Sequence, residues 1–245
     1  MAEYDNRVRS HGATGDLAID VGLRAYMLRV YNYMLMGLGL TGLTAFFTLY
    51  TPAFSNLFFT FTANGYTMSP LGWVVLLAPL GLVFFLSFRI QSMSFTAAQT
   101  TFWVYAGLMG IGLTPILYIY TGTSVAQVFF ITAATFGAMS LYGYTTKRDL
   151  SGFGSFLFMG LIGIIIASLV NMFMQSGMMQ WIISVAGVLI FTGLTAYDTQ
   201  SIKESYYVGD DGTVAGKKAV MGALRLYLDF INLFLMLLRL MGDRR

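Results

Sequence analysis

Long apolar runs separated by short polar stretches dominate the chain. A helix needs about 20 mostly apolar residues to cross the hydrocarbon core of a membrane, whereas the strands of a membrane barrel alternate between apolar and polar positions. The apolar runs here are continuous, so the pattern predicts an all-α integral membrane protein. Seven runs qualify as transmembrane helices, at roughly 30–50, 71–88, 101–120, 125–144, 155–175, 179–199 and 219–241.

The composition supports a membrane protein, because 57% of the 245 residues are hydrophobic and only 10% are charged. Soluble domains carry about 25% charged residues. We predict a mobile polar tail at 1–29, a transmembrane domain at 30–241 and a short C-terminal tail at 242–245. The first tail has no continuous apolar stretch, so it is not expected to be a signal peptide. The expected partner is the lipid bilayer, since a net charge of +3 does not suggest nucleic acid.

Lysine and arginine are distributed unevenly between the connections. None occurs in the connections after the first, third and fifth runs. The positive-inside rule therefore places the N-terminus in the cytoplasm. Seven crossings would put Arg244 and Arg245 outside, so a re-entrant last segment is an alternative. The positions that carry this bias are Arg7, Arg9, Arg24, Arg29, Arg89, Lys147, Arg148, Lys203, Lys217 and Lys218.

Cysteine is absent, and the one histidine is His11 in the polar tail. Thiolate metal sites and His-assisted nucleophilic catalysis are thereby excluded, so we expect no enzyme and no tightly bound cofactor. An aspartyl protease, in which two carboxylates share a proton, needs no histidine. Two apolar runs carry an acid, as described below. The second of them lacks the glycine-containing motif that such a protease is expected to carry around its acid.

Asp229 lies deep inside the last apolar run, eleven residues beyond Lys218. Along a helix this is about 16 Å, close to the middle of a core about 30 Å thick. A charged Asp at this depth costs roughly 3 kcal/mol or more, so it must face the protein, form a pair or stay protonated. Arg225 is four residues earlier on the same helix face. Two interpretations follow. Arg225 and Asp229 form an isolated ion pair without function, or Asp229 is a functional acid.

Asp198 stands near the end of the sixth run, in "FTGLTAYDTQSIKES". It could cap the helix end or face water. Alternatively the helix continues for one or two turns, since no Gly or Pro follows at once, and Asp198 then lies in the same half of the membrane as Asp229. Two carboxylates about 4 Å apart repel by roughly 4 kcal/mol at an effective dielectric of 20. Such a pair would share one proton near neutral pH, and losing it would separate the helices or recruit a cation.

The same two acids would bind a metal cation only weakly. Calcium prefers six to eight oxygen ligands, whereas Asp198 and Asp229 offer at most four. Asn232, three residues beyond Asp229, is a possible auxiliary ligand. We therefore expect transient Ca²⁺ binding during passage and no storage site.

The stretches "GLTAYDTQSIK", "LYLDFINLFLMLLRL" and "LSFRIQSMS" resemble the bacterial members of the transmembrane Bax inhibitor motif family. The resemblance implies seven helices, with the last one central between two groups of three. It implies that Asp198 and Asp229 form a pH-sensing pair at the mouth of a calcium-leak pore. It also implies that Arg89 latches onto the acid of the sixth helix, and that a membrane-anchored AAA protease is a possible partner. A location in the cytoplasmic (inner) membrane follows from the same resemblance.

Two features depart from the family pattern. The second run carries no acid, and Arg225 beside the central Asp opposes cation passage. The leading hypothesis is a pH-sensitive leak for Ca²⁺ or other cations, with Asp198 and Asp229 as sensor and Arg89 and Arg225 as charge partners. The alternative is a non-conducting membrane scaffold that regulates a membrane protease or another integral membrane protein.

Overall fold

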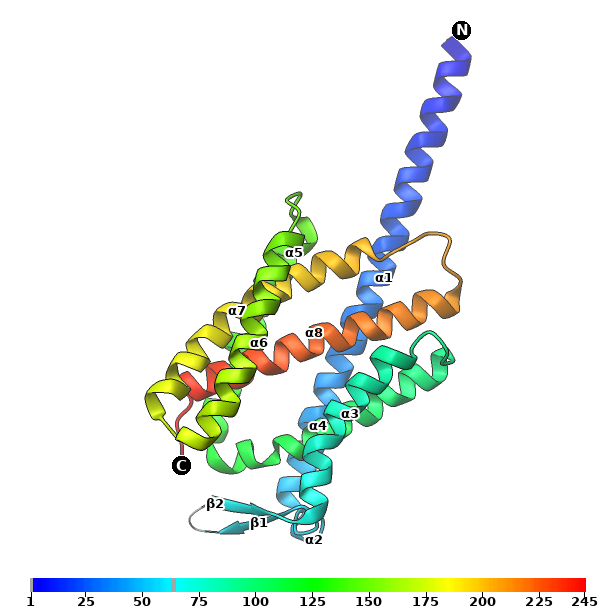
Figure 1. Ribbon diagram of the computed structural model, residues 1–245. Helices are drawn as coiled ribbons and strands as arrows, with labels where there is room; N and C mark the ends of the chain where they lie inside the picture. Colours follow the sequence, from blue (N-terminus) through cyan, green and yellow to red (C-terminus); the bar gives the residue numbers. More distant parts are fainter. Residues whose placement is uncertain (1, 63–64) are drawn as a thin grey trace.

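The computed structural model describes residues 2–62 and 65–245, with side chains described from residue 21 onward. The described part of the chain contains seven helices long and apolar enough to cross a membrane, which confirms the predicted fold class. A short helix and a two-stranded hairpin complete it (Figure 1). The elements are α1 (Ala2–Tyr50), α2 (Pro52–Ser55), β1 (Phe59–Thr62), β2 (Gly65–Met68), α3 (Pro70–Arg89), α4 (Phe95–Ile119), α5 (Gly122–Thr145), α6 (Ser151–Met174), α7 (Gly177–Glu204) and α8 (Gly212–Met241).

Helix α8 is the centre of the bundle. Within its most apolar window 72% of the residues are buried, against 17% to 33% in the other six spans. Helices α1, α3 and α4 pack together on one side of α8, and α5, α6 and α7 pack together on the other (Figure 1). This arrangement confirms the expected two groups of three around a central last helix.

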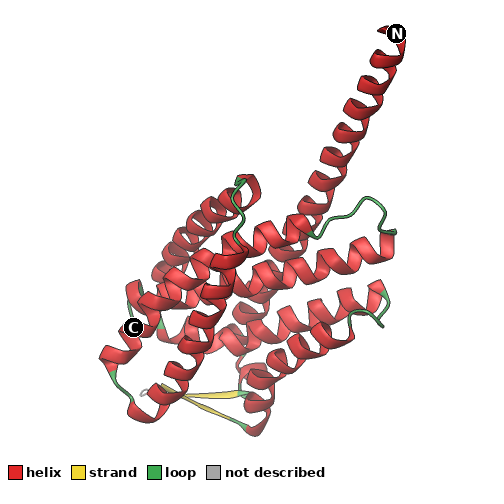
Figure 2. Cartoon of the chain, turned by 45° about the horizontal axis from the view of Figure 1, so that its top comes forward, coloured by secondary structure: helices red, strands yellow, loops and turns green. Residues whose placement is uncertain are grey.

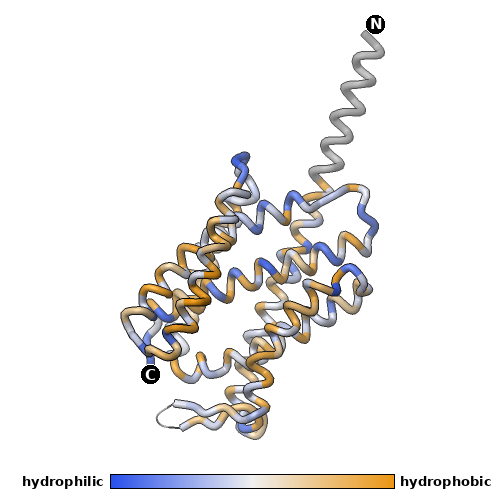
Figure 3. The backbone as a smooth tube through the Cα atoms, viewed as in Figure 1, coloured by the Kyte–Doolittle hydropathy of each residue, from blue (hydrophilic) through white to orange (hydrophobic). Residues whose placement is uncertain are grey.

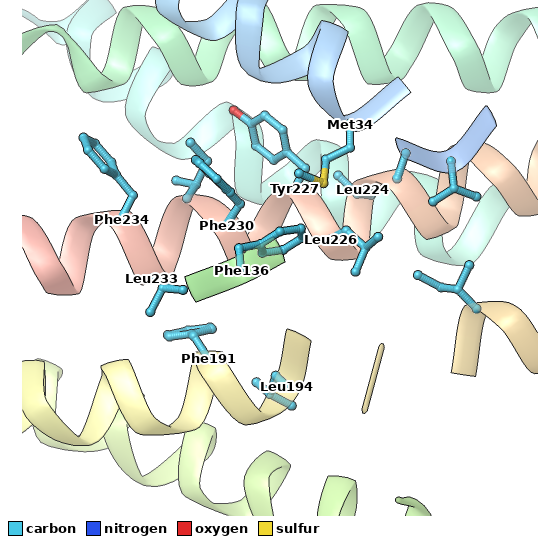
Figure 4. Packing of buried hydrophobic residues seen from close by; sticks show 14 of the residues in the cluster. Met34, Phe136, Phe191, Leu194, Leu224, Leu226, Tyr227, Phe230, Leu233 and Phe234 are labelled. Atoms are coloured by element: carbon cyan, nitrogen blue, oxygen red, sulfur yellow. The ribbon is translucent and has the colours of Figure 1, made fainter. Parts of the chain in front are cut away.

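The core consists of large side chains that α8 directs towards both groups. Figure 4 shows Tyr227, Phe230 and Leu233 of α8 among side chains from α1, α5 and α7. The ring of Phe230 lies 5.5 Å from that of Phe136 on α5, in an edge-on arrangement. The outer helices instead expose large apolar side chains, such as Phe88 and Phe173, as a lipid-facing surface requires.

The charged connections gather at one end of the bundle, which we call the basic end. It comprises the connections α3–α4, α5–α6 and α7–α8, with Arg89, Lys147, Arg148, Lys203, Lys217 and Lys218. Lys217 Nζ donates to Gln91 O at 3.1 Å, which ties the start of α8 to the α3–α4 connection. Figure 3 shows hydrophilic segments at these connections, and hydrophilic positions also interrupt the middle of α8.

Two helix boundaries differ from those expected. Helix α1 continues back to Ala2, although we expected a mobile polar tail at 1–29, and its apolar span begins at Val21. Met1 lies outside the described residues, and so do the side chains of residues 2–20, including His11. Helix α7 continues to Glu204, six residues beyond Asp198 (204 − 198), so Asp198 does not cap its end.

A hairpin that the sequence pattern did not predict follows α1 at the end opposite the basic end (Figure 2). Phe59 pairs with Met68, and Phe61 with Tyr66. The hairpin is fixed to α4, because Tyr118 Oη donates to Thr62 O at 2.8 Å and the Tyr118 ring stacks on Phe61 at 4.5 Å. Its apolar alternation spans only four residues in each strand, too few to stand out beside the long apolar runs.

The last residues are docked and do not form a free tail. Helix α8 is continuous to Met241 and ends away from the basic end, which excludes the re-entrant alternative. Thr121 N donates to Asp243 O at 3.0 Å, and Asp243 N donates to Ser124 Oγ at 2.9 Å. The residues 242–245 therefore pin the end of α8 to the α4–α5 connection.

Small residues allow α1 and α4 to come close. Ala106 is fully buried, and its carbonyl accepts a hydrogen bond from Thr41 Oγ1 at 2.9 Å. A Cβ atom at Gly110 would collide with Thr44 and with the backbone of Thr41. The small residues at 106 and 110 thus form the close helix contact that their spacing predicts.

A second pair with the same spacing, Gly163 and Ala167, does not form such a contact. A Cβ atom at Gly163 would meet nothing within 4 Å. Helix α6 packs against α7 through Gly154, which faces Tyr197, and through Gly160, where a Cβ atom would lie 2.7 Å from Ile190 Cδ1. Spacing alone therefore does not identify which face of α6 is buried.

Two glycines of α4 provide a test of this packing. We expect Gly110→Ala to lower the free energy of unfolding by about 1–3 kcal/mol, because the added methyl group overpacks the α1–α4 contact. The matched change Gly112→Ala should leave stability unchanged or raise it by up to about 1 kcal/mol, since a Cβ atom there meets nothing within 4 Å. Unfolding in mixed micelles of increasing SDS content measures both. Equal losses in the two variants would contradict the assigned contact.

Candidate functional site

Helices α7 and α8 run side by side because each has a glycine where the other needs space. A Cβ atom at Gly222 of α8 would lie 3.1 Å from Ile202 Cγ2, and one at Gly187 of α7 would lie 2.7 Å from Met236 Cγ. The connection between the helices is held by Lys218, whose Nζ bonds Asp210 Oδ2 at 2.6 Å and Ser205 O at 3.0 Å. This antiparallel pairing places position 198 opposite the segment around 225–229.

The structure brings the two predicted acids together. Asp229 is 4% exposed, and Asp198 is half-buried. Their carboxyl groups are close enough for the charge on one to act on the other. Oδ2 of Asp229 is buried and receives no hydrogen bond from any N–H or hydroxyl group of the described residues. An ionised carboxylate only accepts hydrogen bonds, so a bond between these two groups requires one shared proton.

Arg225 is the cation at this site. Its charge acts on both Asp198 and Asp229, while its own side chain is exposed. Among the described side chains the ion pair found within 4 Å is Lys218–Asp210, so a private Arg225–Asp229 pair is not formed. One guanidinium therefore acts on two acids, so a doubly ionised pair would leave the site with a net negative charge.

Two other predicted site residues, Arg89 and Asn232, are not among the groups whose charge acts on the acids. Arg89 is exposed in the last turn of α3, and the groups that act on Asp198 are Arg225 and Asp229. Among the described side chains Arg89 forms no ion pair within 4 Å, so the expected latch on Asp198 is not formed in this structure. Asn232 donates from Nδ2 to Leu228 O of its own helix at 2.8 Å.

A chain of hydroxyl groups beside Asp198 was missed by the sequence reasoning. Tyr31 Oη of α1 lies 2.5 Å from Ser140 Oγ of α5, which lies 3.0 Å from Thr199 Oγ1 of α7. Thr199 in turn donates to Thr195 O at 2.7 Å. A usable signal was present, because hydroxyl residues four apart within an apolar run share one helix face.

Gln200 is a second residue that the sequence reasoning missed. It is buried, accepts from Leu150 N at 2.8 Å and donates to Arg148 O at 2.9 Å. Lys203 Nζ donates to Tyr144 O at 2.8 Å and lies over the Tyr144 ring. Together they hold the end of α5 and the α5–α6 connection against the last turns of α7, next to Asp198.

The acids form a site of two carboxylates. Among the described residues no group of three or more His, Cys, Asp or Glu side chains gathers as a metal site would require. Asp198 and Asp229 together supply at most four oxygens, fewer than the six to eight that Ca²⁺ prefers. The chemistry available here is proton exchange and loose cation contact.

Comparison with known proteins identifies the family. The profile of the family described as "Inhibitor of apoptosis-promoting Bax1" matches residues 23–245, which include all seven apolar spans almost entirely. The chain belongs to the Bax inhibitor family. The resemblance noted in the sequence is thereby confirmed.

Relatives of this Bax inhibitor family chain align along nearly its whole length. The inner membrane protein YbhL of Escherichia coli (strain K12) is 48% identical over 226 residues, which cover 91% of this chain and 94% of YbhL. The protein RP147 of Rickettsia prowazekii (strain Madrid E) is 48% identical, with 92% of each chain covered. A membrane protein of Streptococcus pyogenes serotype M3 (strain MGAS315) is 43% identical, with 91% and 94% covered. The seven spans and these relatives together establish a membrane protein.

A proton shared between Asp198 and Asp229 would have a measurable consequence for stability. Raising the pH removes that proton and leaves two negative charges in a buried site, so the free energy of unfolding should fall as the pH rises from about 6 to about 8. We expect a loss of the order of 1 kcal/mol, because a repulsion of roughly 4 kcal/mol at about 4 Å is partly offset by Arg225. The Asp229→Asn variant should lose this pH dependence in SDS-induced unfolding.

The control is Asp149→Asn, which removes an exposed carboxylate of the α5–α6 connection whose Oδ1 accepts from Ser151 N at 2.8 Å. That variant should keep the pH dependence of the native chain. The same slope in native protein and Asp229→Asn would show that the two acids do not share a proton.

Proposed function

We propose that this Bax inhibitor family protein is a pH-sensitive leak for Ca²⁺ or other cations, gated by Asp198 and Asp229. The observation that carries the proposal is the closeness of the two acids where α7 packs against α8 inside the bundle. Ionisable residues inside a membrane are costly and usually mark ion or proton pathways. A purely packing role is disfavoured by the unpaired Oδ2 of Asp229, because an unsatisfied buried acceptor costs about 1–3 kcal/mol.

The proposed gate works through charge balance. With one shared proton, the acid pair carries one negative charge, which Arg225 neutralises, and α7 and α8 stay together. Without the proton the pair carries two negative charges, so the site is net negative. It then attracts a cation and pushes the two carboxyl groups apart. Cation passage is therefore expected to increase as the pH rises.

The site supports transient cation binding and no enzymatic reaction in this proposal. Two carboxylates and one amide at Asn232 provide too few ligands to retain Ca²⁺. The inner membrane is the proposed location, since the relative YbhL is an inner membrane protein. No cofactor is required for the proposed passage.

The non-conducting scaffold is the competing proposal. Its support is the polar N-terminal segment, which carries Glu3, Asp5, Arg7 and Arg9 and precedes the apolar span at Val21. A charged segment outside the membrane suits contact with a membrane-anchored protease or another membrane protein. In this proposal the acid pair would only stabilise the α7–α8 contact.

Calcium uptake into liposomes separates the two proposals. Liposomes with the native chain should take up more Ca²⁺ at about pH 8 than at about pH 6. In Asp198→Asn and Asp229→Asn the ratio between the two pH values should fall to about one, because a single carboxylate cannot share a proton with a neutral amide in the same way. The control Asp149→Asn should behave as the native chain.

Flux that stays at the level of protein-free liposomes at both pH values would reject the leak and favour the scaffold. Flux with an unchanged pH ratio in both Asn variants would retain a leak but remove the acids as its sensor. In each case the unfolding data on Asp229→Asn report separately on whether the proton is shared.

We also propose that the basic end lies in the cytoplasm, as the distribution of Lys and Arg favours. The chain has no cysteine, so single-cysteine variants carry no background. Val208→Cys in the exposed α7–α8 connection should react with a membrane-impermeant maleimide only after the membrane is opened. Thr67→Cys, exposed in β2, should react in intact spheroplasts. The opposite pattern would invert the topology.

A further inference from the structure

An apolar groove of about 630 Å³ runs between α1 and α5, on the line where the two groups of three helices face each other. Its floor is formed by side chains from three helices, Met34 of α1, Phe136 of α5 and Phe230 of α8, which meet in Figure 4. Leu28, Leu35 and Leu141 line the rim and are more than half exposed. The volume lies within the range of about 300–1,000 Å³ typical of ligand sites lined mainly by hydrophobic residues.

The groove has one charged end. Arg24 lines it at the basic end, together with Tyr144, and the lining residues include no acid. Lys203 Nζ lies 5.7 Å from the centre of the Tyr144 ring, so a second cation flanks the same mouth. Among the described side chains Arg24 takes part in no ion pair within 4 Å.

The length of the groove matches one leaflet of a membrane. From Arg24 to Leu35 helix α1 advances eleven residues (35 − 24), about 17 Å at 1.5 Å per residue. Half of a hydrocarbon core of about 30 Å is about 15 Å. A ligand whose charged group sits at Arg24 would therefore reach the middle of the membrane with its apolar part.

We propose that this groove binds one anionic phospholipid, with an acyl chain against Met34, Phe136 and Phe230 and the phosphate at Arg24. Basic pockets between transmembrane helices are known sites for anionic lipid headgroups. The bound acyl chain fills the space between the group α1, α3 and α4 and the group α5, α6 and α7. The acyl chain would lie next to the Tyr31–Ser140 hydrogen bond, because both of these side chains also line the groove. This inference does not depend on cation passage.

A glycine in the groove wall allows a direct test. Gly137 lines the groove, and a Cβ atom there would meet nothing within 4 Å, so Gly137→Leu fills the groove without a clash in the protein. Gly163 of α6 is equally open but lies outside the groove, and Gly163→Leu is the matched control. Both changes add the same side chain to an exposed position of a transmembrane helix.

The measurement is native mass spectrometry of the purified chain in detergent with equal amounts of phosphatidylglycerol and phosphatidylcholine. The native protein and Gly163→Leu should retain one lipid per chain, with phosphatidylglycerol preferred about fivefold, as one Arg near the headgroup provides. Gly137→Leu should lose this lipid. Arg24→Gln should retain a lipid but no longer distinguish the two headgroups.

Three results would overturn the proposal. Equal retention of lipid by Gly137→Leu and the native chain would place the lipid elsewhere. Loss of lipid in both leucine variants would show a general effect of surface bulk. Equal binding of the two lipids by the native chain would remove Arg24 as the headgroup site.

Discussion

The arrangement of the whole bundle follows from the cost of placing charge in hydrocarbon. Helix α8 carries Arg225, Asp229 and Asn232 within a stretch long enough to cross the membrane. Exposing such a helix to lipid costs several kcal/mol, and the cost falls only where protein surrounds it. The other six spans therefore enclose α8, and they accept lipid on their own outer faces because their exposed side chains are mostly apolar. The central helix is thus the most polar of the buried elements.

Contacts between helices in a membrane gain little from the hydrophobic effect, since lipid tails are as apolar as leucine. This protein relies on close approach and hydrogen bonds instead. Thr41 links α1 to the backbone of α4 and to Tyr227 of α8 at 2.7 Å. Tyr31, Ser140 and Thr199 link α1, α5 and α7. The second set of hydroxyl groups joins the two groups of three helices along the boundary that also contains the apolar groove. Tyr31 and Ser140 line that groove, and Thr199 is next to Asp198 in α7, so this hydrogen-bonded chain connects the groove with the acid site.

The two acids lie on helices that are tied to neighbouring elements at both ends of the bundle. Asp198 lies less than two turns from the end of α7, and Asp229 lies beyond the middle of α8, counted from its start. Near the basic end Lys218 holds the α7–α8 connection, and Gln200 and Lys203 tie the last turns of α7 to the α5–α6 connection and the end of α5. At the opposite end the docked residues 242–245 hold the end of α8.

The sequence by itself determined the seven spans and the two acids within them, because long apolar runs and isolated charges are local properties, whereas the central position of the last helix was expected only from the family resemblance. It also indicated that α7 continues past Asp198. Only the tertiary structure decided that Arg225 and not Arg89 is the cation beside the acids, and that Gly110 packs closely while Gly163 does not. The same holds for the groove between α1 and α5. These features depend on how helices far apart in the chain rotate against one another, and a pattern within one helix does not specify which neighbour its face will meet.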